Sequence, residues 1–189
     1  MISVFLDACV LVPVTLTNVI LTAAENGLVR PYWSHEVVEE AVDAIREVRP
    51  NLSEDRVRRR FVAMDAAFEG ASVSGDPSTL DGRGLPDVDD QHVVAAAIAA
   101  GASVIVTANI RDFPKAVMAS LGMSVLSPDD FLLRLAEADG EAMVNVVARV
   151  AETLRNPERA PEDILVALEL SGARRFAFEI RRLLTTDAE

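Results

Sequence analysis

The sequence is poor in cysteine and contains no long apolar segment. Its single cysteine, Cys9, cannot form a disulfide within the chain, and we expect it to pack as a small core residue in a reducing compartment. No apolar run approaches the roughly 18 residues that a membrane-spanning helix requires. The first residues also lack the basic flank and the cleavage site of a signal peptide. These absences predict a cytoplasmic protein that does not act at a membrane.

Lysine is nearly absent as well, and acidic residues outnumber basic ones. Lys115 is the only lysine among 18 basic residues, against 30 acidic residues, and the net charge is −12. This balance excludes a general nucleic-acid coating protein, because the affinity of such proteins for phosphates comes mainly from lysine and arginine. It does not exclude a nuclease, since bound metal ions would neutralise part of the acidic charge. A local basic cluster is also present at Arg56, Arg58, Arg59 and Arg60.

Short apolar segments alternate with helical ones, which indicates an α/β fold. The segment 2–6 is apolar without alternation, as expected for a strand that is buried on both faces of a parallel sheet. We expect further strands at 28–33, 104–107 and 123–126, and a short one near Val73. Helical patterns separate these segments, so we predict a mainly parallel central sheet.

The pattern changes after Gly140, where only helical segments remain. The length of 189 residues suits one globular domain of ordinary size with a short appendage. We therefore predict an α/β domain at 1–138 and a small all-helical extension at 139–189.

Acidic residues gather at one edge of the predicted sheet. Asp7 ends the first strand, and Asp112 lies in the loop after the third. Ligands of an open parallel sheet bind beyond the carboxyl ends of the strands, so both residues fall on the binding edge. Two further segments can bring carboxylates there, namely the helix with Glu39 and Glu40 and the turn with Asp87, Asp89 and Asp90.

Carboxylates that converge from distant segments predict a site for a divalent metal ion. A carboxylate at the end of an apolar strand costs free energy unless a cation or hydrogen-bond donors compensate it. Mg²⁺ and Mn²⁺ prefer hard oxygen ligands and take the remaining ligands from water and substrate phosphates, which indicates phosphodiester hydrolysis. Local explanations exist for some of the acids: Asp89 and Asp90 could cap the following helix, and Asp112 could form a turn. Asp7 has no such local explanation.

The order of these motifs resembles the PIN-domain family, and specifically the VapC-type toxins of bacterial toxin–antitoxin pairs. The resemblance covers roughly residues 1–135 and rests on the segments 7–9, 34–40, 85–92 and 106–113. It implies a three-layer α/β/α fold and a metal-dependent endoribonuclease that uses Mg²⁺ or Mn²⁺ to hydrolyse RNA. It further implies a homodimer and a cognate antitoxin as the protein partner.

The resemblance also implies a role for individual residues. Asp7 and Asp90 become the central metal ligands, and Glu40 becomes the glutamate of the helix that follows the second strand. Asp87 would bind the metal directly or through water. Many relatives have aspartate where this chain has Asn109, so Asp112 becomes the more suitable carboxylate and Asn109 would orient water or phosphate. The remaining assignments are Thr107, which would hydrogen-bond an acidic ligand, and Arg111, which would contact a phosphate.

Some alternatives stay open at this point. Helical phase does not separate Glu39 from Glu40, because they flank the apolar face of their helix about equally. The substitution at Asn109 leaves room for a catalytically degenerate PIN fold that acts as an RNA- or protein-interaction module. A magnesium-dependent phosphoryl-transfer protein of the haloacid-dehalogenase or receiver kind is less favoured, because Cys9 replaces the second acid of the former and Lys115 follows no strand directly. The extension could cover the cleft, form the dimer interface or receive the antitoxin.

Overall fold

Four parallel strands form one sheet at the centre of the protein. The structure is a computed structural model, and it describes residues 1–80, 85, 89–153 and 159–186. The strand order is β2-β1-β3-β4. The strands are β1 (Ile2–Leu6), β2 (Val29–Tyr32), β3 (Val104–Val106) and β4 (Ser124–Leu126). The predicted parallel sheet is therefore confirmed.

The two central strands are buried because helices cover both faces of the sheet. Val4, Phe5 and Leu6 of β1 are inaccessible to solvent, and all of β3 is buried. Leu6 lies opposite Val106 in the pairing of β1 with β3. The residues that follow these two strands therefore emerge side by side at the carboxyl edge of the sheet.

The expected short strand near Val73 is instead an isolated bridge. Trp33 pairs with Ser72 in parallel, with hydrogen bonds from the Trp33 amide to the Ala71 carbonyl at 3.0 Å and from the Val73 amide to the Trp33 carbonyl at 2.9 Å. Because the contact involves a single position of each segment, it does not extend into a fifth strand.

Helices connect the strands and follow the last of them in the described part of the chain. The first five are α1 (Ala8–Leu11), α2 (Val14–Glu25), α3 (His35–Val48), α4 (Glu54–Ala67) and α5 (Gln91–Ala99). The other five are α6 (Lys115–Ser120), α7 (Pro128–Ala138), α8 (Gly140–Thr153), α9 (Pro161–Leu170) and α10 (Arg174–Thr186). Two short 3₁₀ helices are η1 (Pro77–Leu80) and η2 (Ile110–Asp112). Among the residues that the structure describes, none of the helices has the length and hydrophobicity needed to span a bilayer.

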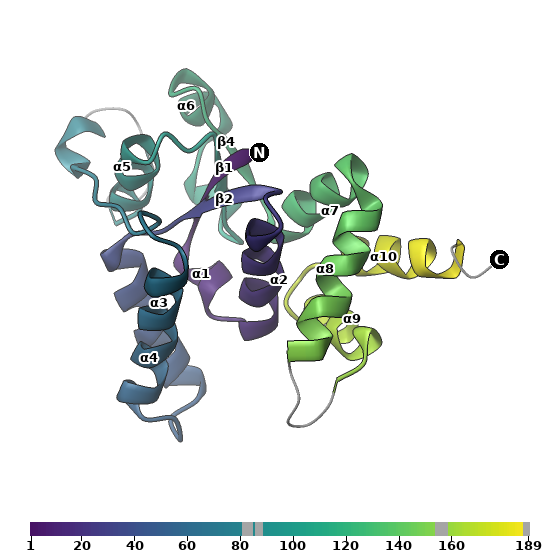
Figure 1. Ribbon diagram of the computed structural model, residues 1–189. Helices are drawn as coiled ribbons and strands as arrows, with labels where there is room; N and C mark the ends of the chain where they lie inside the picture. The colour runs from purple at the N-terminus through teal and green to yellow at the C-terminus, as the bar shows by residue number, and fades with distance from the viewer. Residues whose placement is uncertain (81–84, 86–88, 154–158, 187–189) are drawn as a thin grey trace.

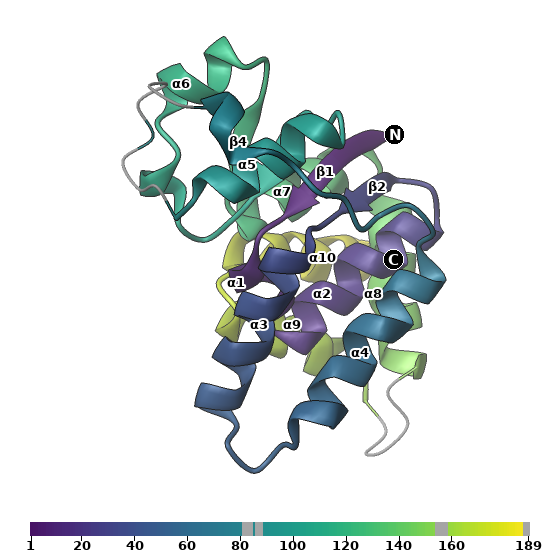
Figure 2. The same ribbon diagram turned by 90° about the vertical axis from the view of Figure 1, so that its left-hand side faces the viewer.

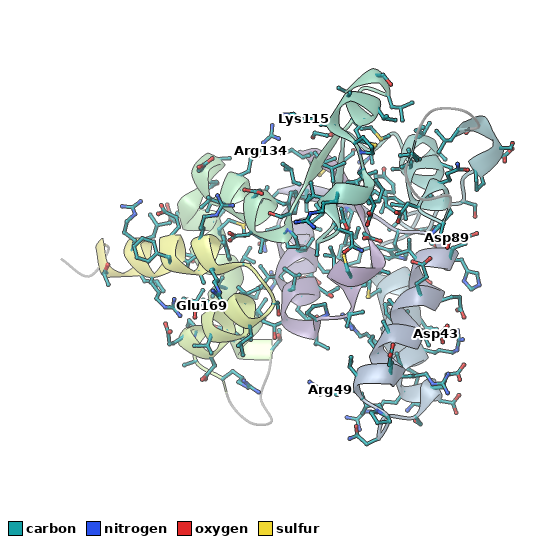
Figure 3. All side chains as sticks on the ribbon, turned by 180° about the vertical axis from the view of Figure 1, so that it is seen from behind. Asp43, Arg49, Asp89, Lys115, Arg134 and Glu169 are labelled. Carbon is teal, nitrogen blue, oxygen red and sulfur yellow. The ribbon has the colours of Figure 1, made fainter. Side chains whose placement is uncertain are left out.

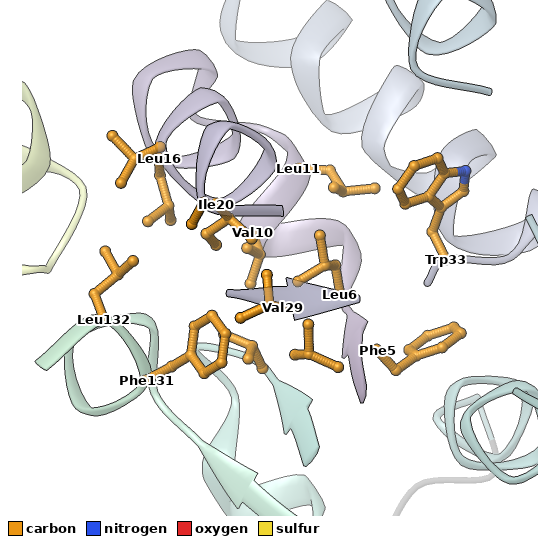
Figure 4. Close-up of a cluster of buried hydrophobic side chains, with 14 of the residues drawn as sticks. Phe5, Leu6, Val10, Leu11, Leu16, Ile20, Val29, Trp33, Phe131 and Leu132 are labelled. Atoms are coloured by element: carbon orange, nitrogen blue, oxygen red, sulfur yellow. The ribbon is translucent and has the colours of Figure 1, made fainter. Parts of the chain in front are cut away.

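The helices make the molecule a three-layer structure, as predicted. α5 and α6 lie on one side of the sheet, and α2 lies on the other side (Figures 1 and 2). Between the sheet and α2, a cluster of fully buried side chains joins the strands to α1, α2 and α7 (Figure 4). Its members include Leu6, Val10, Ile20, Val29 and Phe131.

The C-terminal helices pack against the outer side of α2. α8 and α9 both contact α2, and α10 contacts α7, α8 and α9. The carboxylate of Asp129 in α7 accepts hydrogen bonds from the Phe176 amide at 2.9 Å and from Arg175 Nε at 2.8 Å, both in α10. Because α7 also contacts β4, it belongs to the packing of both regions. The domain boundary at 138/139 stays a prediction.

Candidate metal centre

Asp7 lies directly after β1 and is the buried acidic group of the site. The residue is 6% exposed, and all the hydrogen-bond donors that contact its carboxylate are neutral. The Ala8 amide donates to Oδ1 at 2.7 Å, while Cys9 Sγ and Thr107 Oγ1 donate to Oδ2 at 3.2 and 2.5 Å. In the described part of the chain, no lysine or arginine forms an ion pair with Asp7.

Thr107 attaches the loop after β3 to Asp7. The residue is completely buried, and its hydroxyl donates to Asp7 while it accepts a hydrogen bond from the Asn109 amide at 2.9 Å. The loop continues into η2, where the Asp112 amide donates to the Asn109 carbonyl at 3.0 Å. The loop with exposed Asn109 and half-buried Asp112 is therefore held at the same sheet edge as Asp7.

Cys9 is a hydrogen-bonding thiol in this arrangement. Its Sγ donates to Asp7 and accepts from the Ala108 amide at 3.2 Å. Burial raises the pKa of the thiol to about 11, and the negative charge of Asp7 adds to this effect. The protonated thiol is therefore the form present at neutral pH.

The structure separates the two glutamates that helical phase left equivalent. Ser34 caps α3 by accepting a hydrogen bond from the Val37 amide at 3.2 Å, which fixes the start of the helix. Glu39 then faces α4, where Arg58 binds both of its carboxylate oxygens at 2.6 and 2.8 Å. Glu40 instead contacts His92 of α5, with 2.9 Å between Oε1 and Nε2.

His92 was not among the predicted site residues, although it lies within the acidic cluster. Its hydrogen bond with Glu40 raises the pKa of the imidazole, and burial opposes this effect. Glu40, Glu36 and Asp7 all raise this pKa through their charges, so the ring lies near two carboxylates of α3 and the one that follows β1. The sequence signal is weak, since His92 is one of two polar residues at the start of a helix that is otherwise apolar.

The other acidic residues of the predicted site differ in their burial and in their hydrogen bonds. Asp90 is half-buried at the start of α5, and its side chain makes no capping hydrogen bond there. Exposed Asp89 lies between α5 and α3, the helix that also carries Asp43 (Figure 3). Asp87 lies outside the described residues. Asp112 is held near Asp7 only through the loop, since no hydrogen bond or ion pair of the described chain joins the two carboxylates.

The chemistry of these donors fits a divalent cation. Asp7 is buried and forms no ion pair with a lysine or arginine of the described chain, and Glu40 and Asp90 add hard oxygen donors. Within the described ranges, no group of three or more His, Cys, Asp or Glu residues is gathered closely enough to hold a metal ion. The donors of the described residues come from the residue after β1, from α3 and from the start of α5, and they do not form a complete metal site by themselves.

Replacement of Thr107 by valine tests how the site holds Asp7. Valine keeps the shape of the side chain but removes both the donor to Asp7 and the acceptor for the Asn109 amide. We expect Mn²⁺ affinity, measured by titration, to fall about 10- to 100-fold, the range found when the partner of a metal ligand is removed. Thr107→Ser keeps the hydroxyl and serves as the control. Equal affinities of the valine and serine variants would show that the hydroxyl is not needed.

Comparison with known proteins gives a family match for each of the two regions of the chain. The family model described as PIN domain matches residues 3–111, which is more than half of the chain. The model described as VapC50 C-terminal domain matches residues 128–182. A protein of Mycobacterium tuberculosis (strain ATCC 25618 / H37Rv) named "Putative ribonuclease VapC50" is 36% identical over 94 residues, which cover 50% of this chain and 55% of that protein. The aligned segment thus spans about half the length of this relative, and no solved structure matches the chain. The chain belongs to the PIN-domain family and carries a VapC50-type C-terminal domain after its PIN domain.

Proposed function

We propose that the protein is a metal-dependent endoribonuclease that hydrolyses RNA phosphodiester bonds and acts as the toxin of a toxin–antitoxin pair. The observation that carries this proposal is Asp7, a buried carboxylate that pairs with no lysine or arginine of the described chain, at the carboxyl edge of a parallel sheet. The chain segments next to Asp7 at that edge also carry acidic side chains. The name of the mycobacterial relative supports RNA as the substrate.

Mg²⁺ or Mn²⁺ is the cofactor that these residues suit. Asp7 and Asp90 would be its central ligands, with Glu40 and Asp112 as further carboxylates of the site and Asp87 as an additional donor. When bound, the ion would lower the pKa of a water molecule and stabilise charge on the leaving oxygen.

The side chains of the protein would orient these groups and bind the RNA. Thr107 and Cys9 hold Oδ2 of Asp7 in place, so that the carboxylate does not rotate away. Arg111 is exposed in the loop anchored by Thr107 and has no ion-pair partner in the described part of the protein. A free guanidinium beside the acidic edge can bind an RNA phosphate in bidentate fashion. Asn109, also exposed, can orient water or phosphate.

Cleavage of total cellular RNA by the purified protein tests the proposal. We expect fragments in the presence of Mg²⁺ or Mn²⁺ and none after addition of EDTA. Intact RNA with both metals, in a sample that is folded and free of bound protein, would contradict endonuclease activity on general cellular RNA.

Replacement of Glu40 by glutamine is expected to lower the cleavage rate by at least about tenfold, because the substitution removes a charged donor from the metal site. Glu39→Gln is the matched control, since Glu39 is the neighbouring residue but is bound to Arg58 of α4. Initial rates at saturating Mn²⁺ compare the two variants. If Glu39→Gln loses more activity than Glu40→Gln, our assignment of the glutamate is wrong.

The toxin assignment also implies a protein partner and an oligomeric state. We infer that a cognate antitoxin binds the protein in the cytoplasm and that the nuclease is a homodimer. A gene for a small DNA-binding protein next to the gene of this chain would support the pairing.

A second function is favoured by one observation. Asn109 is exposed and neutral at a position where a further carboxylate would complete the site, so a catalytically degenerate PIN fold that binds RNA or protein is the alternative. Failure of the pure protein to bind Mn²⁺ would favour this alternative.

A further inference from the structure

His92 joins two helices that otherwise pack against different neighbours. α3 packs on α1 and α4, whereas α5 packs on β1, β3 and η1. The contact between His92 Nε2 and Glu40 Oε1 at 2.9 Å therefore links the glutamate of one helix to the other helix. His92 lies two residues after Asp90, so the same helix start that carries a proposed ligand also carries the contact to Glu40.

Glu40 depends on this contact for its orientation. Its side chain is 50% exposed, and a half-exposed glutamate loses rotamer freedom only if a partner holds it. In the part of the chain that the structure describes, His92 is the partner of Glu40. The adjacent Glu39, by contrast, is held by Arg58, which also binds Glu54.

The imidazole is suited to hold one carboxylate in place. The His92 side chain is only 19% exposed, so packing restricts its movement. Nδ1 is buried and has no hydrogen-bond partner among the described residues. The contact of the ring with a carboxylate is therefore made through Nε2, which faces Glu40. A packed ring with a single hydrogen bond defines the direction of that bond more sharply than a long flexible side chain would.

We propose that His92 is a positioning residue of the metal centre, which donates from Nε2 to Glu40 and holds this carboxylate ready for the metal ion. The inference rests on the proposed function, because it assigns Glu40 to the metal site. Partners that orient ligands in this way change metal affinity by about 10- to 100-fold when they are removed. His92 thus acts through Glu40 and touches neither the metal nor the RNA.

Binding of Mn²⁺ alone to the full chain, followed by the electron paramagnetic resonance signal of free Mn²⁺, tests this role. We expect His92→Leu to lower Mn²⁺ affinity about 10- to 100-fold. His92→Gln keeps an N–H donor at a similar distance from the backbone and is expected to bind close to the wild type. In RNA cleavage, the leucine variant should lose kcat while KM for RNA is unchanged, and the glutamine variant should recover kcat.

A double-mutant cycle with Glu40→Gln shows whether His92 acts through Glu40. We expect His92→Leu to cause no further loss of Mn²⁺ affinity when Glu40 is already glutamine. Full additivity of the two losses, or wild-type affinity of a folded His92→Leu variant, would overturn the inference.

Asp7→Asn separates failure of this inference from failure of the proposed function. If the wild type binds Mn²⁺ and Asp7→Asn does not, the metal centre stands, and an unaffected His92→Leu variant then refutes only the positioning role. If the wild type and Asp7→Asn both bind no Mn²⁺, the proposed function fails and the role of His92 fails with it. Far-ultraviolet circular dichroism of each variant controls for loss of the fold.

Discussion

RNA cleavage is expected to fall by more than about 100-fold when Asp7 is replaced by asparagine, the scale seen when one electrostatic catalytic group is removed. Asparagine has nearly the same shape and keeps an oxygen that can accept from the Ala8 amide. Its amide group can donate to the Thr107 hydroxyl, which reverses the direction of that hydrogen bond without a change of position. The Cys9 thiol loses its acceptor at Oδ2, but its sulfur can accept from the same amide. The fold should therefore remain, and the main loss is the negative charge at the sheet edge.

Asp90→Asn is expected to give the same loss of cleavage for the same reason. If Asp90 served only as a helix cap, asparagine would replace it without effect, since both residues are favoured at that position. The exposed neighbour provides the control, because Asp89→Asn changes the same net charge and should keep activity. Cleavage at the wild-type rate by a folded Asp7→Asn/Asp90→Asn double variant would refute the metal centre.

Replacement of Asp129 by alanine is expected to destabilise the protein by about 2–3 kcal/mol, because a buried amide and a cationic group lose their acceptor. The residue is 8% exposed and accepts from the Phe176 amide at the start of α10 as well as from Arg175. For a chain of this size the loss corresponds to a fall in Tm of about 5–10 °C. Thermal and urea unfolding both measure it.

Asp130→Ala is the matched control for this prediction. Asp130 also binds Arg175, but its side chain is 47% exposed, and exposed ion pairs contribute about 0–1 kcal/mol. A loss for Asp130→Ala as large as that for Asp129→Ala would show that the buried contact between α7 and α10 is not what matters. The same comparison measures how firmly α10 is attached to α7.

The strands of the sheet were predictable because they are short, apolar and bounded by turn or helix signals. The sequence therefore predicted all four strands and their parallel arrangement. The prediction of a short strand near Val73 was wrong, although the apolar and polar residues of that segment resemble those of a strand. In the structure that segment contacts only the end of β2 at Trp33, which allows a bridge but no ladder.

The candidate site was predictable where an acidic residue directly follows an apolar strand. Asp7 stands out because it directly follows an apolar strand, and the burial of its carboxylate agrees with that reasoning. The choice between Glu39 and Glu40 depends on Arg58 of α4 and His92 of α5, which helical phase cannot reveal. Asp129 lies in the first turn of α7, yet its hydrogen-bond partners lie in α10. Contacts between distant segments thus distinguish residues that local patterns left equivalent, and the choice of Glu40 stays a prediction.

Anomalous X-ray diffraction from crystals of the full chain grown with Mn²⁺ would test the metal centre most directly. Our account predicts an anomalous peak bound by the carboxylates of Asp7 and Asp90, with Glu40 directed towards it from α3. The same peak should be lost from crystals of the Asp7→Asn variant. A peak bound elsewhere, or no peak at the carboxyl edge of β1 at saturating Mn²⁺, would contradict the account.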